Sequence, residues 1–143
     1  MATSFDADNV LSHTRWSQIV FLTIAVVFNL CLVAQVLTVG LAFFYSPEWW
    51  NIHVWLVRGY SGLALILLGW VFLNPFPRRV RSLMASMPVL LGLQFLTIHL
   101  KSPFSLAVLH PLIGFALFSA STTLVHRMWR IVSPKPDAES DAS

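Results

Sequence analysis

Two glutamine–histidine pairs are the side chains in this sequence whose types and spacing could do chemistry. Gln35 is followed by His53 after 18 residues, and Gln94 is followed by His110 after 16. Each Gln opens a similar hexapeptide, Gln-Val-Leu-Thr-Val-Gly or Gln-Phe-Leu-Thr-Ile-His, and a break in the apolar sequence separates it from its His. This internal repeat predicts two successive copies of one helical hairpin, with His53 and His110 in equivalent positions.

Two imidazoles that face each other across a bundle axis are suited to ligating haem iron, because the iron accepts one axial ligand on each face of the porphyrin. We therefore predict a b-type haem (heme b) with His53 and His110 as metal ligands. Arg58 offers a two-pronged donor for a haem propionate or an anionic lipid. Gln35 and Gln94 either contact the cofactor or hydrogen-bond neighbouring helices. His99 is a further ligand or a nearby donor.

Four long apolar segments must position these residues. The chain of 143 residues is 57% hydrophobic and only 10% charged, whereas a typical soluble domain is about 25% charged. A helix needs roughly 20 apolar residues to cross about 30 Å of hydrocarbon. Segments of about that length or longer are separated by proline-containing breaks, and the expected spans are residues 19–45, 53–73, 83–100 and 104–125.

The short loops between the expected spans make consecutive spans antiparallel neighbours. The sequence thus predicts an all-α integral membrane four-helix bundle, made of two tandem hairpins related by a pseudo-twofold axis along the membrane normal. This transmembrane domain is expected at 15–130, between a polar N-terminal segment (1–14) and a flexible polar tail (131–143). Gly62 and Gly69, two helical turns apart, would let another helix or a flat ligand come close.

The basic residues predict how the bundle lies in the membrane. Of the nine Lys and Arg residues, only Arg58 and Lys101 fall towards the side of the loops at 46–52 and 101–103. The other seven fall on the side of the termini, so both termini are expected to be cytoplasmic. The expected location is a bacterial plasma membrane or a thylakoid membrane.

Signatures of catalysis are missing from the sequence. No acidic residue lies inside an expected span, and no Gly-rich phosphate loop, Ser/His/Asp set or Cys/His zinc spacing occurs. The net charge of +3 comes without a basic face carrying interleaved aromatic residues, so no nucleic-acid partner is expected. These features favour a non-catalytic or electron-transferring protein whose main partner is the lipid bilayer.

With these residues in view, the chain resembles an uncharacterised family of small four-span bacterial membrane proteins over about residues 15–130. Its members show a Gln near the end of spans one and three and a His at the start of spans two and four. The layout is also similar to one four-helix half of haem A synthase, which implies axial-ligand roles for His53 and His110. This chain has one bundle rather than two and lacks an acidic residue equivalent to a catalytic one. The resemblance therefore implies haem binding rather than haem synthesis.

Two other functions compete with the haem hypothesis. One is an accessory subunit of a larger membrane complex that binds chlorophyll, carotenoid or only lipid. The stretch WWNIHVWLVRGYSG looks cyanobacterial, which favours a photosynthetic setting for this alternative. The other is a transporter, which is disfavoured because the sequence shows neither acidic residues nor broken helices at the membrane midplane.

Overall fold

The computed structural model describes residues 3–100 and 106–133, with side chains from Thr14 onward. Four long helices follow one another along the chain, and a short 3-10 helix precedes the last. Their bounds are α1 (Thr3–Phe44), α2 (Trp49–Leu73), α3 (Arg78–His99), η1 (Leu106–Leu109) and α4 (His110–Val132). No strand occurs in this described part of the chain. The predicted all-α fold is confirmed.

Each of the four helices is long and apolar enough to cross a membrane. The candidate spans are Thr14–Phe44, Trp49–Leu73, Arg78–His99 and Leu106–Val132. Half of these bounds lie four to seven residues outside the expected segments, because the helices continue into flanking Trp and Arg residues that favour the headgroup zone, and the other half agree within two residues. Helix α1 also runs back to Thr3, so it includes most of the polar segment 1–14.

Prolines set several of the helix ends. Asn74 ends α2 with an extended backbone (φ −122°, ψ 155°), as expected for a residue that precedes a proline. Pro77 immediately precedes α3, and Pro111 lies in the first turn of α4, where its missing N–H costs no intrahelical hydrogen bond. Pro88 lies inside α3, which continues through it to His99.

The core is a narrow stripe on each helix rather than a broad face. Its residues recur with alternating steps of four and three, the spacing typical of knobs-into-holes packing in helix bundles. The stripes include Phe21, Ala25, Phe28 and Leu32 on α1; Tyr60, Ala64, Leu67 and Val71 on α2; Val80, Met84, Met87 and Leu91 on α3; and Leu117, Ser121, Leu124 and Met128 on α4. Large apolar side chains also lie outside the stripes, as a lipid environment allows.

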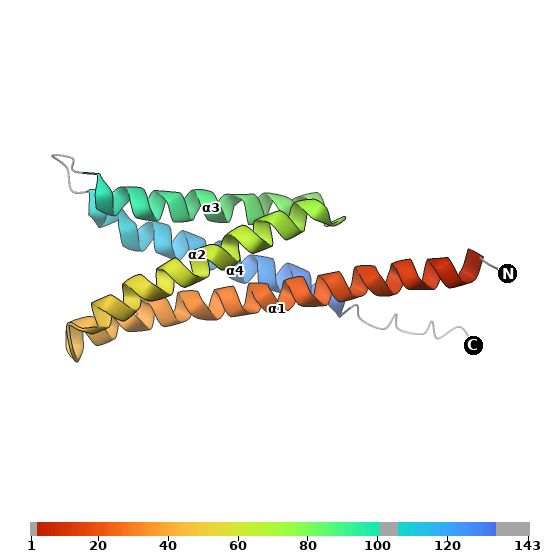
Figure 1. The fold of residues 1–143 in the computed structure, drawn as a ribbon. Helices are drawn as coiled ribbons and strands as arrows, with labels where there is room; N and C mark the ends of the chain where they lie inside the picture. The colour runs from red at the N-terminus through yellow and green to blue at the C-terminus, as the bar shows by residue number, and fades with distance from the viewer. Residues whose placement is uncertain (1–2, 101–105, 134–143) are drawn as a thin grey trace, which may run out of the picture.

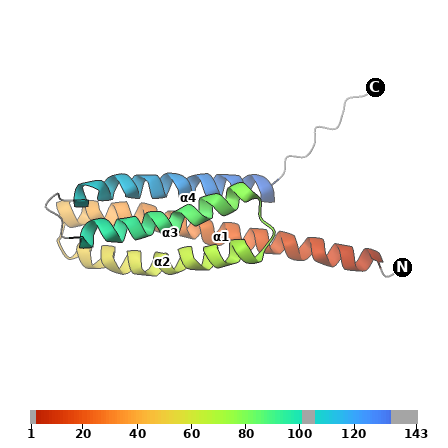
Figure 2. The same cartoon turned by 90° about the horizontal axis from the view of Figure 1, so that it is seen from above.

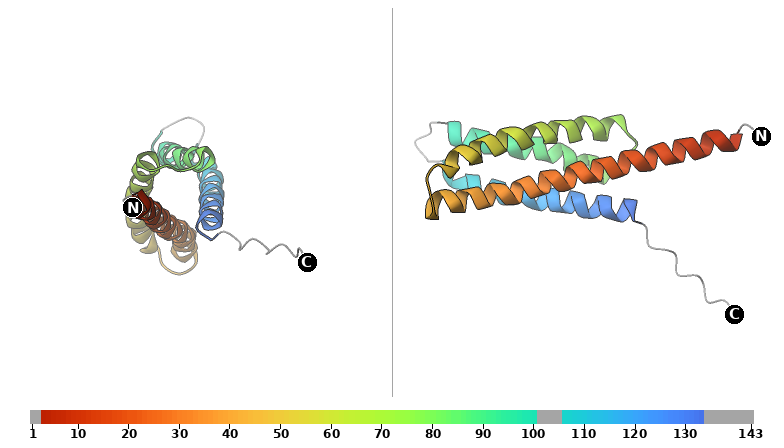
Figure 3. Two further views of the ribbon diagram at one scale, coloured as in Figure 1. Left: turned by 90° about the vertical axis from the view of Figure 1, so that its right-hand side faces the viewer. Right: turned by 60° about the horizontal axis from the view of Figure 1, so that its bottom comes forward.

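The helices form a ring in which each contacts its two neighbours (Figure 3). Helix α1 packs against α2 and α4, and α3 packs against α2 and α4, while the backbones of the diagonal pairs stay apart among the described residues. Figure 1 shows the two hairpins diverging towards the end that carries the α1–α2 turn. The start of α1 and the end of α4 lie at the opposite end, where α1 projects beyond the other helices (Figure 2).

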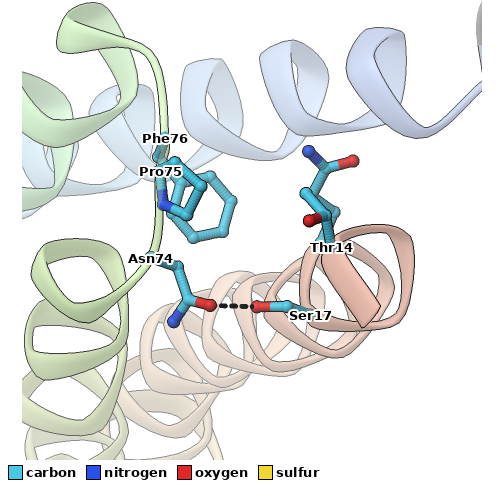
Figure 4. A pocket seen from close by; sticks show the side chains of 6 residues that line it. Thr14, Ser17, Asn74, Pro75 and Phe76 are labelled. Carbon is cyan, nitrogen blue, oxygen red and sulfur yellow. Dashed lines mark hydrogen bonds between the residues drawn. The ribbon is translucent and has the colours of Figure 1, made fainter. Parts of the chain in front are cut away.

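A polar cluster ties three elements together at this opposite end (Figure 4). The Ser17 hydroxyl of α1 donates to Asn74 Oδ1 at 2.8 Å and accepts from Trp70 Nε1 at 3.0 Å. Asn74 Nδ2 donates to the Trp70 carbonyl at 3.0 Å, and an Arg81 guanidinium nitrogen donates to the Asn74 carbonyl at 3.3 Å. Asn74 therefore joins α1, the end of α2 and the start of α3.

Candidate functional site

The first Gln–His pair lies between α1 and α2 at the end of the bundle where the hairpins diverge. Gln35 Nε2 is 2.8 Å from His53 Nε2 and 3.3 Å from the His53 carbonyl oxygen. Thr38, one turn after Gln35, is buried and places its hydroxyl 3.2 Å from His53 Nδ1. Trp50 packs edge-on against the imidazole, with ring centroids 5.4 Å apart. The His53 imidazole is thus in contact with two polar side chains of α1 and one aromatic side chain of α2.

The hydrogen-bond network assigns one tautomer to His53. The Thr38 hydroxyl donates to the Gln35 carbonyl at 2.8 Å, so its oxygen is free to accept from His53 Nδ1–H. His53 Nε2 is then unprotonated and accepts from the Gln35 amide. Both ring nitrogens of His53 are therefore engaged by residues of α1.

The second Gln–His pair lies between α3 and α4 and repeats only part of this arrangement. The Thr97 hydroxyl donates to the Gln94 carbonyl at 2.9 Å, as Thr38 does to Gln35. His110 Nδ1 lies 3.3 Å from that same carbonyl oxygen and donates to it. The Gln94 amide instead reaches Gly114, where its Nε2 lies 2.7 Å from the position a Cβ would take. Among the described residues, His110 Nε2 has no hydrogen-bond partner.

Both glutamines leave a buried oxygen without a partner. Gln35 Oε1 and Gln94 Oε1 are buried side-chain acceptors that receive no hydrogen bond from any described residue. A buried acceptor without a donor costs roughly 1–3 kcal/mol. The two orphaned oxygens occur at equivalent positions of the two hairpins, so each Gln–His pair keeps one unused hydrogen-bond acceptor.

The two histidines extend the core stripes of diagonally opposite helices. His53 precedes Val57 and Tyr60 at steps of four and three on α2, and His110 precedes Gly114 and Leu117 at the same steps on α4. Both side chains are half-buried. The backbones of α2 and α4, which carry the two imidazoles, make no contact with each other among the described residues.

Two other predicted site residues do not join this layer. Arg58 is exposed, and its guanidinium lies over the Trp55 ring at 5.4 Å from the centroid. His99 is exposed as well, and its Nδ1 lies 2.8 Å from the Phe95 carbonyl of its own helix. Neither side chain contacts the Gln–His pairs.

Three glycines of α2 and α4 differ in their surroundings. Gly59 and Gly62 have open space where a side chain would stand, but both are exposed on α2. The space at Gly114 is filled by the Gln94 amide. Within the described ranges, no group of three or more His, Cys, Asp or Glu residues could hold a metal ion, so the histidine pair is the ligand set to consider.

Sequence reasoning undervalued two residues of this layer. Thr38 belongs to the repeated Gln-x-x-Thr pattern, which was visible, but its contact with the imidazole was not predicted. Trp50 was not predicted as a site residue, and its ring packs against His53. Its position three residues before His53 on a helix is the signal that could have placed it there.

The comparisons with known proteins identify one similarity. A model described as a family of unknown function (DUF6220) matches residues 35–99. The matched stretch begins at Gln35 and ends at His99, so it contains the first Gln–His pair and Gln94. No curated protein and no solved structure matches the chain. Over the matched stretch the chain is therefore similar to a family whose function is not established.

Proposed function

We propose that this chain is a small membrane-embedded haem-binding protein in which His53 and His110 are the axial ligands of a b-type haem. The observation that carries the proposal is the position of the two imidazoles. They extend the core stripes of diagonal helices at the same end of the bundle. Ligands on diagonal helices would face each other across the bundle interior, with the neighbouring helices on either side.

The surrounding residues meet several demands of such a group. His110 Nδ1 donates to the Gln94 carbonyl, which fixes the ring and leaves Nε2 as the atom available to iron. Both Gln–His pairs lie at the end of the bundle where the two hairpins diverge (Figure 1).

The proposal requires one local rearrangement, at Gln35. Its amide occupies His53 Nε2, so it must turn away before this nitrogen can ligate iron. The exchange gives up one hydrogen bond with a net worth of about 1 kcal/mol. His53 Nδ1 would keep its bond to Thr38, which holds the ring in the tautomer that ligation needs.

Bound haem supplies one-electron chemistry, and the chain's residues would hold it, orient it and limit the access of water. We accordingly propose electron transfer, rather than catalysis, as the activity. We also propose a bacterial plasma or thylakoid membrane with cytoplasmic termini, since every described arginine except Arg58 lies at the terminal end of the bundle.

The test is the absorption spectrum of protein purified in mild detergent after expression with a haem precursor. We expect a Soret band that sharpens on reduction in the wild type, and its loss in His53→Ala and His110→Ala. His99→Ala is the matched control, because this exposed histidine lies near the same end and bonds only to its own helix. No Soret band after titration with hemin would contradict the proposal, and co-purified chlorophyll or carotenoid would support a pigment-binding accessory subunit instead.

A further inference from the structure

A groove between α1 and α4 lies at the other end of the bundle from the histidines. It has a volume of about 460 Å³, within the range of roughly 300–1,000 Å³ seen for small-molecule sites. Its wall is formed by Ile19, Leu22, Thr23, Val26, Val27, Trp129, Val132 and Ser133. The groove has no part in the proposed haem site.

The wall of this groove is suited to a hydrocarbon chain. Six of its eight side chains are apolar. The Thr23 hydroxyl is already satisfied, because it donates to the Ile19 carbonyl of its own helix at 3.0 Å. From Ile19 to Val27 the α1 side of the groove runs for about 12 Å along the helix. It lies inside the candidate span Thr14–Phe44 and therefore faces lipid rather than water.

Basic and aromatic residues lie at the outer end of the groove. Arg15 is one turn before Ile19, so it lies on the same face of α1 just beyond the groove. Arg130 is one turn before Ser133 on α4, and both arginines are exposed. Trp16 and Trp129 are 68% and 60% exposed at this level, as is typical of side chains at the boundary between hydrocarbon and headgroups.

The arginines at this end of the bundle have no carboxylate partner among the described side chains. Their single carboxylate belongs to Glu48, in the α1–α2 turn at the opposite end of the bundle. Arg15 and Arg130 thus have no carboxylate partner among the described side chains, and each lies one helical turn from a residue of the groove wall, Ile19 or Ser133. Guanidinium groups bind phosphate oxygens through paired hydrogen bonds.

We infer that this groove binds one acyl chain of an anionic phospholipid, whose headgroup phosphate is held by Arg15 and Arg130. The complementarity of charge selects an anionic headgroup, and the apolar wall selects a chain rather than a free phosphate ion. The lipid would fill the outer seam between α1 and α4. A second copy of this chain offers no described acidic surface to these arginines.

The experiment compares binding of dioleoyl phosphatidylglycerol and dioleoyl phosphatidylcholine to delipidated protein by native mass spectrometry. We expect the wild type to retain phosphatidylglycerol preferentially. The double variant Arg15→Gln/Arg130→Gln should lose affinity for it on the order of thirtyfold, since each basic group near a membrane surface contributes about 1 kcal/mol. The matched control is Arg78→Gln/Arg79→Gln, which removes the same charge from the same end but away from the groove.

A second variant tests the chain-binding part of the site. Thr23→Trp places a large ring in the groove and should reduce retention of phosphatidylglycerol while Arg15 and Arg130 remain. Circular dichroism of each variant verifies that the bundle is folded. Equal retention of the two lipids by the wild type, or equal losses in the two double variants, would overturn the inference in favour of diffuse attraction to a basic surface.

Discussion

The side-chain nitrogen of Gln35 lies 2.8 Å from Nε2 of His53, the ring nitrogen through which the histidine would ligate iron. The equivalent Gln94 makes no such contact with His110 and reaches Gly114 instead. The two hairpins therefore carry the same residue types in different hydrogen-bonding states. Among the described residues, His110 Nε2 has no hydrogen-bond partner, whereas both ring nitrogens of His53 contact residues of α1.

Removing the Gln35 amide should strengthen haem binding. Gln35→Leu keeps much of the side-chain volume but frees His53 Nε2, so the affinity for haem should rise by up to about tenfold, the value of one net hydrogen bond. Gln94→Leu is the matched control and should change the affinity less, because its amide does not contact a histidine. Titration with hemin in detergent measures both variants. A lower affinity in Gln35→Leu than in Gln94→Leu would contradict this assignment of Gln35.

Filling the space at Gly114 should destabilise the bundle. The Gln94 amide occupies this position, so Gly114→Leu must displace it and should lower the free energy of unfolding by about 1–3 kcal/mol. Gly69→Leu is the control, since no atom lies within 4 Å of its Cβ position, and its stability should stay close to that of the wild type. Thermal melts in the same detergent compare the two. Similar melting temperatures of the two variants would show that displacing the Gln94 amide does not destabilise the bundle.

Loss of Asn74 should loosen the end of the bundle that carries the termini. Asn74→Ala removes the acceptor for Ser17 and the donor to the Trp70 carbonyl, and we expect a loss of roughly 1–2 kcal/mol in stability. Asn51→Ala is the control, because Asn51 is exposed and its side chain makes no hydrogen bond within the described part of the chain. Unfolding by denaturant in detergent distinguishes them, and equal stabilities would contradict a structural role for the cluster.

Part of the site followed from the sequence because helical periodicity is simple. The repeat predicted a second hairpin like the first, with His53 and His110 in equivalent positions, and the structure shows each histidine beside the Gln residue of its own hairpin. The same periodicity explains why Arg58 and His99 lie elsewhere. Each is five residues after a member of a pair, which is about 140° around a helix from that residue.

Further features of the site divide into those that residue spacing predicts and those that it cannot. Gly62 comes nine residues after His53, on the opposite side of α2, so its exposure could have been predicted from the spacing. The different directions of the two glutamine amides could not, because they depend on side-chain rotamers and on the space left at Gly114. The divergence of the hairpins depends in the same way on packing between all four helices (Figure 1).

The orientation proposed for the bundle can be checked by cysteine labelling. In a Cys31→Ser background, Glu48→Cys should react with a membrane-impermeant maleimide in intact bacterial cells, whereas Ser133→Cys should react only after permeabilisation. The reason is the cluster of arginines at the end that carries Ser133. The reverse pattern of labelling would place the termini outside the cytoplasm.

Helix α1 projects beyond the other three helices at the terminal end of the bundle (Figure 2). Its 42 residues extend for about 63 Å, roughly twice the thickness of the hydrocarbon layer. If the membrane surface lies near Trp16, the first three turns stand in water without a neighbouring helix. A protease that acts from that side should reach this unsupported part of α1 first. Limited digestion should therefore shorten α1 and leave the bundle assembled.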